Sequence, residues 1–203
     1  MMIKIDPQNQ TERENYKLLI GSVIPRPIAF VTSMDEKGVV NGAPFSYFNV
    51  VSSNPPMLSV SVQRKKGEPK DTAKNIIAQK EFVIHLVDED NVEKINETAA
   101  NLPYGESETE HAGLELLASD IVRTPGIVEA KVRYECELVH TWEIENEGEV
   151  TGDFFIGRIV RFHLDEAVYE AGKINYGALK AVSRLAGNDY ATIGDVLTIE
   201  RPR

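Results

Sequence analysis

Alternation of apolar and polar residues with a period of two is the dominant pattern along this chain. Residues 58–63 show it most clearly, because leucine and valines occupy one set of alternate positions and serines and a glutamine occupy the other. Such a segment predicts a strand with one packed face and one face of small polar groups that is open to a ligand. We expect further strands over 28–33, 81–87, 128–141 and 153–164.

Helical signals are fewer and shorter. Thr11 and Glu14 have the T-x-x-E spacing of a capping box, which predicts the start of a short helix. Further helices are expected over 71–79 and 91–100. Because strands outnumber helices and mostly follow one another through short turns, residues 1–203 are predicted to form a single, mainly β domain with some α. Its expected architecture is an antiparallel barrel or sandwich with a few peripheral helices across its ends.

Composition and charge narrow the classes of function. The chain has 203 residues, of which 42% are hydrophobic and 27% charged, and its net charge is −10. An acidic surface repels phosphate backbones, so we expect no nucleic-acid partner. The first residues lack the pattern of a signal peptide and no apolar run approaches membrane length, which favours a cytoplasmic protein without membrane association. The polar stretch 102–113 is expected to be a long functional loop.

Several kinds of chemistry lack their usual residues. Cys136 is the only cysteine, which excludes an internal disulfide and a thiolate metal cage, and its place in an alternating strand predicts a buried small hydrophobe. The four histidines are scattered, so we expect no metal site. Neither G-x-G-x-x-G after a strand nor G-x-x-x-x-G-K-[ST] occurs, so any bound nucleotide is held by another device.

Small polar residues gather at two predicted strand ends. Thr32 and Ser33 close one strand, and the run NGAPFSYFN over 41–49 combines hydroxyls, amides and aromatic rings. A flat heteroaromatic ligand needs apolar faces and hydrogen bonds along its edge, which these residue types supply. Composition alone favours the simpler interpretation, a turn that carries two core aromatics.

A second cluster lies at the start of the helix expected over 71–79. Asp71 or Thr72 is expected to cap this helix, and its first free amides together with the Lys70 ammonium would form an anion site. Arg64 and two lysines lie just upstream. The cluster therefore predicts a phosphate cradle, although an ordinary N-cap beside a solvated basic loop explains the spacing equally well.

Taken in order along the chain, these fragments resemble the flavin reductase-like, FMN-binding split-barrel family, which includes the reductase components of two-component monooxygenases, such as component B of nitrilotriacetate monooxygenase, and the flavoredoxins. The resemblance covers nearly the whole chain. The matching fragments lie at 25–33, 35–38, 41–48, 55–56, 70–76, 81–83, 112–114 and 184–190. In the last of them, Ala186 and Gly187 stand where the family often has two glycines.

The resemblance implies a homodimer of six-stranded Greek-key split barrels with FMN near the subunit interface. It implies that Thr32 and Ser33 line the ribityl or phosphate side, and that Lys70 and Thr72 hold the phosphate. The other residues that it places around FMN are Arg26 near the ring, Ser46, Tyr47, Phe48 and Asn49 at the ring edge, Ser61, Val62 and Gln63 on the floor, Arg64 and Asp71 beside the phosphate, and Arg184 and Tyr190 in the closing segment.

The resemblance further implies an oxidoreductase that transfers hydride from NADH or NADPH to FMN and supplies a monooxygenase or other redox partner. Such chemistry needs two stacked rings, exclusion of water and well-placed donors, so we name no catalytic side chain. Two other functions stay open. One is an FMN-binding electron carrier that docks to a redox partner, and the other is a hydrolase or isomerase on the same barrel, which the two polar clusters disfavour.

Overall fold

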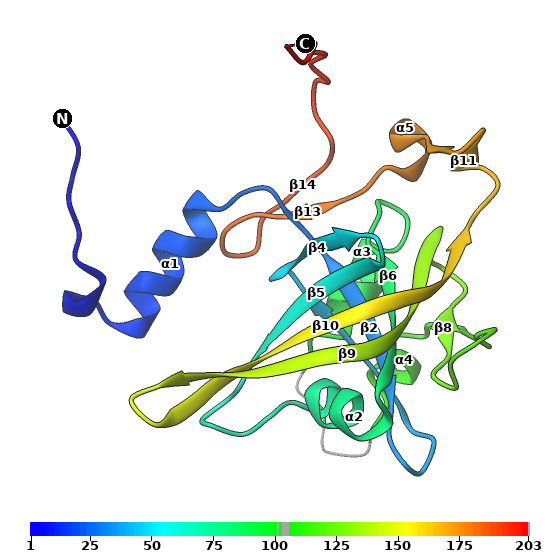
Figure 1. Ribbon diagram of the computed structural model, residues 1–203, viewed down its shortest axis with the longest axis horizontal. Helices are drawn as coiled ribbons and strands as arrows, with labels where there is room; N and C mark the ends of the chain where they lie inside the picture. The colour runs from blue at the N-terminus through cyan, green and yellow to red at the C-terminus, as the bar shows by residue number, and fades with distance from the viewer. Residues whose placement is uncertain (101, 103–105, 203) are drawn as a thin grey trace.

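An antiparallel sheet of seven strands forms the body of the protein in the computed structural model, which describes residues 1–100, 102 and 106–202 (Figure 1). The order of its strands is β3-β2-β6-β9-β10-β5-β4. Their bounds are Ala29–Met34 (β2), Val40–Phe45 (β3), Phe48–Ser53 (β4), Pro56–Gln63 (β5), Glu81–Leu86 (β6), Val132–Asn146 (β9) and Glu149–Leu164 (β10). The two longest strands, β9 and β10, form a hairpin that reaches well beyond the rest of the sheet (Figure 1).

The two ends of this strand order are consecutive in the chain. Only Ser46 and Tyr47 separate β3 from β4, so residues 40–53 run as one bent strand that pairs with β2 before the bend and with β5 after it. At the bend, the Ser61 amide donates to the Tyr47 carbonyl at 2.9 Å. When β3 and β4 are counted as one strand, the sheet has the six strands expected of the barrel, and the prediction of a mainly antiparallel β-fold is confirmed.

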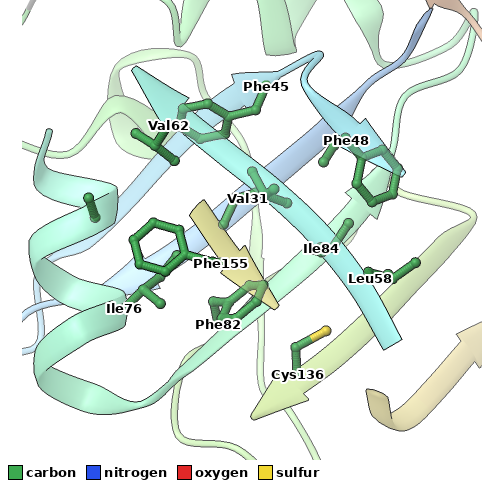
Figure 2. Packing of buried hydrophobic residues seen from close by; sticks show 13 residues of the cluster. Val31, Phe45, Phe48, Leu58, Val62, Ile76, Phe82, Ile84, Cys136 and Phe155 are labelled. Atoms are coloured by element: carbon green, nitrogen blue, oxygen red, sulfur yellow. The ribbon is translucent and has the colours of Figure 1, made fainter. Parts of the chain in front are cut away.

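Apolar side chains from the inner faces of this sheet fill the barrel (Figure 2). Fully buried members include Val60, Phe82 and Phe155, and Cys136 is buried among them as predicted. The cluster consists of Ala29, Val31, Phe45, Phe48, Leu58, Val60, Val62, Ala73, Ile76, Phe82, Ile84, Cys136 and Phe155. Because α2 supplies Ala73 and Ile76, this helix is fixed against the barrel by the same core (Figure 2).

Helices and short strands surround the barrel. The helices are α1 (Glu12–Ser22), α2 (Asp71–Gln79), α3 (Val92–Glu97), α4 (Glu108–His111) and α5 (Tyr176–Leu179), with a short 3-10 turn η1 (Pro7–Asn9) before them. The expected capping box at Thr11 is present, and α2 has the predicted bounds. The helix expected over 91–100 is shorter than predicted. Of the loop expected over 102–113, residues 103–105 lie outside the described part.

A second apolar cluster lies outside the barrel, between β2 and α3. It contains Phe30 and Ile95 together with Ile28, Val87, Ala112, Leu114, Ile127 and Val182. His85 is fully buried beside it, where Nδ1–H donates to the Phe30 carbonyl and Nε2 accepts from the Ile127 amide, each at 3.0 Å. Burial lowers the pKa of His85 to about 3, so this histidine is neutral and its two nitrogens serve the fold.

The last part of the chain returns across the barrel towards α1 (Figure 1). There β13 (Ser183–Arg184) pairs with β1 (Arg26–Pro27) and with β14 (Tyr190–Ala191). The remaining short strands are β7 (Leu116–Leu117), β8 (Gly126–Ile127), β11 (Tyr169–Glu170) and β12 (Lys173–Ile174). Within the described residues, no helix is both long and apolar enough to cross a bilayer.

Candidate functional site

Three adjoining cavities follow the bent strand β3–β4 on the outside of the barrel. The helix-end cavity, at the start of α2, has a volume of about 340 Å³ and is lined by Asn41 and Thr72. The bend cavity, of about 280 Å³, is lined by Ser46 and Gln63. The α3 cavity, of about 240 Å³, lies against that helix. Pro44 lines all three, so the cavities adjoin one another, and together they are called the groove.

The start of α2 lies at the helix-end cavity, which is lined by the first residues of this helix. The sequence predicted Asp71 or Thr72 as the cap, which is wrong, because Lys70 occupies the N-cap position and no side chain caps this terminus. The first amides of an α-helix have no partner within the helix, and the helix dipole makes this end positive. An uncapped terminus at a cavity wall is therefore suited to an anion.

The ammonium group of Lys70 lies between the helix-end and bend cavities, both of which it lines. Its Nζ stands 5.7 Å from the centroid of the Phe45 ring. Partial burial lowers the pKa of Lys70, and the nearby charge of Lys65 lowers it further. An anion bound beside Lys70 would offset both effects, since its negative charge would favour the protonated amine.

A chain of hydrogen bonds runs through the wall of the helix-end cavity. Thr72 Oγ1 donates to Asn41 Oδ1 at 2.7 Å, and Asn41 Nδ2 donates to Glu108 Oε2 at 2.7 Å. Burial raises the pKa of the Glu108 carboxyl. Sequence reasoning gave Glu108 no role, because its contact with Asn41 joins residues that are 67 positions apart and no local pattern signals it.

Arg26 is buried under the bend cavity and ties three parts of the chain together. Its Nη1 donates to the carbonyls of Ile20 at 2.7 Å and Val23 at 2.6 Å, and its Nη2 donates to the carbonyl of Leu185 at 2.8 Å. Its Nε lies 3.5 Å from Ser46 Oγ. The guanidinium therefore connects the segments that form the walls of the groove, and among the groove's polar side chains it contacts Ser46.

The other walls of the bend cavity carry groups that suit the edge of a flat ring. Ser46, Tyr47, Ser61 and Gln63 all line it. Gln63 Nε2 donates to Ser61 Oγ at 3.4 Å, which links these two side chains. Burial raises the pKa of Tyr47, so its hydroxyl stays protonated and can donate.

Arg184 and Tyr190 come together at the boundary of the bend and α3 cavities. They are paired across β13 and β14, and the Arg184 guanidinium carbon lies 4.4 Å from the centroid of the Tyr190 ring. Tyr190 Oη donates to Asn96 Oδ1 at 2.8 Å, which connects this arm to α3. Ten of the sixteen residues expected around FMN thus line the groove. They are Arg26, Ser46, Tyr47, Ser61, Gln63, Lys70, Asp71, Thr72, Arg184 and Tyr190.

The structure does not bring five uncharged residues of the expected set to the groove. Thr32 is fully buried and donates to the Pro125 carbonyl at 2.7 Å. Ser33 is also fully buried, between Asn75 and Asn41. The other three are Phe48 and Val62, whose side chains belong to the barrel core, and Asn49, which lies exposed on β4.

Arg64 also lies away from the groove, and its charge is paired with two carboxylates. Its guanidinium contacts both carboxylate oxygens of Asp153, at 3.0 and 2.7 Å, and it pairs with Glu143 at 2.7 Å. Asp153 is fully buried. The bond to Asp153 raises the pKa of Arg64, so the pair is a structural contact between the end of β5 and the β9–β10 hairpin.

One grouping of potential metal ligands occurs among the described residues, and it is separate from the groove. It consists of Asp120, Glu135 and His163. The Glu135 carboxylate is fully buried and accepts hydrogen bonds from the amides of 120, 121 and 122 and from His163 Nε2. Burial by itself would raise the pKa of Glu135, but these bonds lower it to about 2. The carboxylate thus fastens the 120–122 loop to β9.

Comparison with known proteins adds independent information. A family model described as "Flavin reductase like domain" matches residues 20–180. YwrF of Bacillus subtilis is 53% identical over 193 residues, which cover 94% of each chain. The structure of nitrilotriacetate monooxygenase component B from Bacillus cereus is 52% identical, with a TM-score of 0.96 and coverage of 98% of this chain and 99% of that one.

Two further structures extend the likeness. The 2-nitrobenzoate 2-nitroreductase NbaA of Pseudomonas fluorescens is 30% identical, with a TM-score of 0.89 and coverage of 98% of this chain and 96% of that one. A split-barrel protein of Shewanella frigidimarina is 22% identical, with a TM-score of 0.83 and 96% of each chain covered. At that identity the likeness concerns the fold alone, and it confirms the predicted split barrel.

Proposed function

The chain belongs to the flavin reductase-like domain family, and from that membership we propose that it is an NAD(P)H:FMN oxidoreductase, a flavin reductase that binds FMN and passes hydride to it from NADH or NADPH. The observation that carries the proposal is the groove along β3–β4. At one end it has an uncapped helix terminus with a lysine, and further along it has hydroxyl and amide groups beside an aromatic ring. A flavin mononucleotide has the same sequence of parts, a phosphate at one end and a flat polar-edged ring at the other.

The helix-end cavity is the place for the phosphate. Backbone amides of Asp71 and Thr72 at the start of α2 would donate to its oxygens, and Lys70 would supply the charge. Because the Thr72 hydroxyl proton already goes to Asn41, the amide of Thr72 rather than its hydroxyl is the available donor. Asn41 and Glu108 are positioning residues, because Asn41 accepts the hydrogen bond from Thr72 and is itself bonded to Glu108.

The bend cavity is the place for the ring. Bound FMN supplies the hydride-accepting heterocycle, and the protein needs to orient it and keep water away. Ser46, Tyr47, Ser61 and Gln63 would donate or accept along the ring edge, where negative charge increases on reduction. Arg26 is a positioning residue, since it fixes Ser46 and the walls of the cavity.

The likeness to a monooxygenase component B supports a further part of the proposal, that reduced flavin is supplied to a partner monooxygenase. We also propose a homodimer. Large apolar side chains remain exposed on α1 and on the β9–β10 hairpin, among them Leu19 at 56% and Trp142 at 67%. A second copy of the chain would cover such surface.

A visible absorption titration with FMN, followed by anaerobic addition of NADH or of NADPH, tests this function. We expect a perturbed flavin band that bleaches with at least one of the two nucleotides. A perturbed band that bleaches with neither would indicate the electron-carrier function instead. An unperturbed band would refute flavin binding in this groove.

Lys70→Ala tests the phosphate assignment in the same titration. Loss of one charge-assisted contact of about 1.5–3 kcal/mol predicts FMN binding roughly ten to a hundred times weaker. Lys173→Ala removes the same charge from an exposed position on β12 and serves as the matched control. If both variants bind FMN as tightly as the unaltered protein, the helix-end cavity does not hold the phosphate.

A further inference from the structure

The α3 cavity differs from the helix-end cavity in the charged side chains that line it. Ile28 and Val87, together with Val92 and Ile95 of α3, form an apolar part of its wall, and polar side chains form the rest. Among the described residues that line it, Arg184 is the only one with a charge. The helix-end cavity, by contrast, has two lysines facing three carboxylates. A cation with no carboxylate beside it in the cavity favours an anionic ligand, because no other charged side chain there offsets its charge.

Arg184 is held in place but not neutralised. Its guanidinium lies over the Tyr190 ring at 4.4 Å and one Nη2 proton goes to the Gly187 carbonyl. Tyr190 is itself fixed by its bond to Asn96 of α3. None of the ion pairs found among the described residues includes Arg184. A guanidinium offers five N–H donors in a planar fork that matches a carboxylate, so most of its donors remain for a ligand.

The size of the cavity limits the ligand. Its volume of about 240 Å³ lies below the range of roughly 300–1,000 Å³ that is typical of sites for drug-sized molecules. The apolar part of the wall favours a compact body without polar groups, of the size of a single ring. The charged group belongs at the Arg184 end, and the body belongs against α3 and Ile28.

We propose that the α3 cavity binds a small organic carboxylate with a compact apolar or aromatic body, whose carboxylate pairs with Arg184. The cavity joins the bend cavity through Phe45 and Ser46, which line both. A ligand in it would therefore lie beside the flavin ring. Binding of the carboxylate does not depend on flavin, whereas its place next to FMN rests on the proposed function. A neutral carboxamide of the same shape would gain much less from Arg184.

Calorimetric titrations with benzoate and with benzamide test this proposal, because the two differ in charge but hardly in shape. The full chain is titrated without flavin and again with saturating FMN. We expect benzoate to bind at least about tenfold more tightly than benzamide. In Arg184→Gln we expect the affinity for benzoate to fall to that for benzamide, with benzamide unchanged. Arg158→Gln, an exposed arginine paired with Glu137, is the control and should leave both affinities unchanged.

Val92→Phe provides a second variant, which fills the apolar part of the cavity and leaves Arg184 in place. Val92 lines the α3 cavity but neither of the other two. We expect this variant to lose benzoate binding by tenfold or more and to keep its affinity for FMN. Circular dichroism of both variants verifies that they fold, and if Arg184→Gln does not fold, Val92→Phe still decides the question.

Several outcomes would overturn the proposal. They are equal affinities for benzoate and benzamide, no binding of benzoate, an equal loss of both ligands in Arg184→Gln, and unchanged benzoate binding in Val92→Phe. The outcome is separable from that of the proposed function. Benzoate binding without FMN binding would refute the flavin reductase and keep the carboxylate site, and FMN binding without benzoate binding would do the reverse.

Discussion

Replacing Arg26 with alanine should destabilise the protein strongly, because one buried guanidinium connects α1, β1 and the returning C-terminal segment. Arg26 is 6% exposed and makes three hydrogen bonds of 2.6–2.8 Å to the carbonyls of Ile20, Val23 and Leu185. A hydrogen bond from a charged donor contributes about 1.5–3 kcal/mol, so three at the lower value give about 4.5 kcal/mol. Because water regains part of this at the freed carbonyls, we expect unfolding to become easier by about 3 kcal/mol.

Urea denaturation of the flavin-free protein, followed by far-ultraviolet circular dichroism, measures this change. The stability of Arg26→Lys should lie between that of the unaltered protein and that of Arg26→Ala, since one ammonium cannot reach all three carbonyls. Arg158→Ala is the control for loss of an arginine. Its pair with Glu137 is about half exposed on both sides and should contribute less than about 1 kcal/mol. If Arg26→Ala unfolds within 1 kcal/mol of the unaltered protein, roughly the control's limit, the guanidinium does not clamp these segments.

Three further predictions concern contacts that lie outside the groove. In Glu135→Gln the free energy of unfolding should depend less on pH between 2 and 4.5. The pKa of Glu135 is about 2 in the folded protein against an ordinary 4.5, a difference worth about 3 kcal/mol of stability that is present above pH 4.5 and is lost as the pH falls toward 2. Urea denaturation at several pH values measures this dependence, and an unchanged profile in the variant would contradict the prediction. Arg64→Ala should lower the free energy of unfolding by about 3–5 kcal/mol, because it leaves the buried Asp153 unpaired, and it should not change the affinity for FMN. A tenfold loss of affinity in an FMN titration would show instead that Arg64 contributes to the phosphate site. Gly157→Ala would place a Cβ 2.5 Å from Phe82 Cζ in the barrel core, which should lower the free energy of unfolding by about 1–3 kcal/mol. An unaltered melting temperature would show that the Phe82 ring moves aside without cost.

The alternation of apolar and polar residues with a period of two predicted much of the fold. In β5 the alternation assigned the packed face correctly, since Leu58, Val60 and Val62 are buried in the barrel. On the other face Ser61 and Gln63 line the bend cavity, whereas Ser59 is buried. The same pattern shows why Val62 cannot also face a ligand there, although the family resemblance had placed it in the site. Side chains in a strand alternate between faces, so residues next to each other in the sequence seldom share one.

Family membership was also accessible from the sequence, because ordered short motifs over most of a chain are independent of how the chain packs. The matching family model and the 52% identity to a component B confirm it. The site residues could be predicted only as clusters. The strand turn at Ser46 and the helix start at Lys70 do line one groove, but the sequence could not place them on the same side of the barrel.

The tertiary structure decided which polar groups are available to a ligand. Arg64 and Lys70 look alike in the sequence, yet Arg64 is paired with Asp153, 89 residues away, whereas Lys70 lines the groove. Thr32 likewise has its hydroxyl bonded to the Pro125 carbonyl, 93 residues away. A local pattern specifies backbone conformation and which face is buried, because those depend on neighbours in the chain. Whether a charge or hydroxyl is free depends on partners that only the closed barrel brings near.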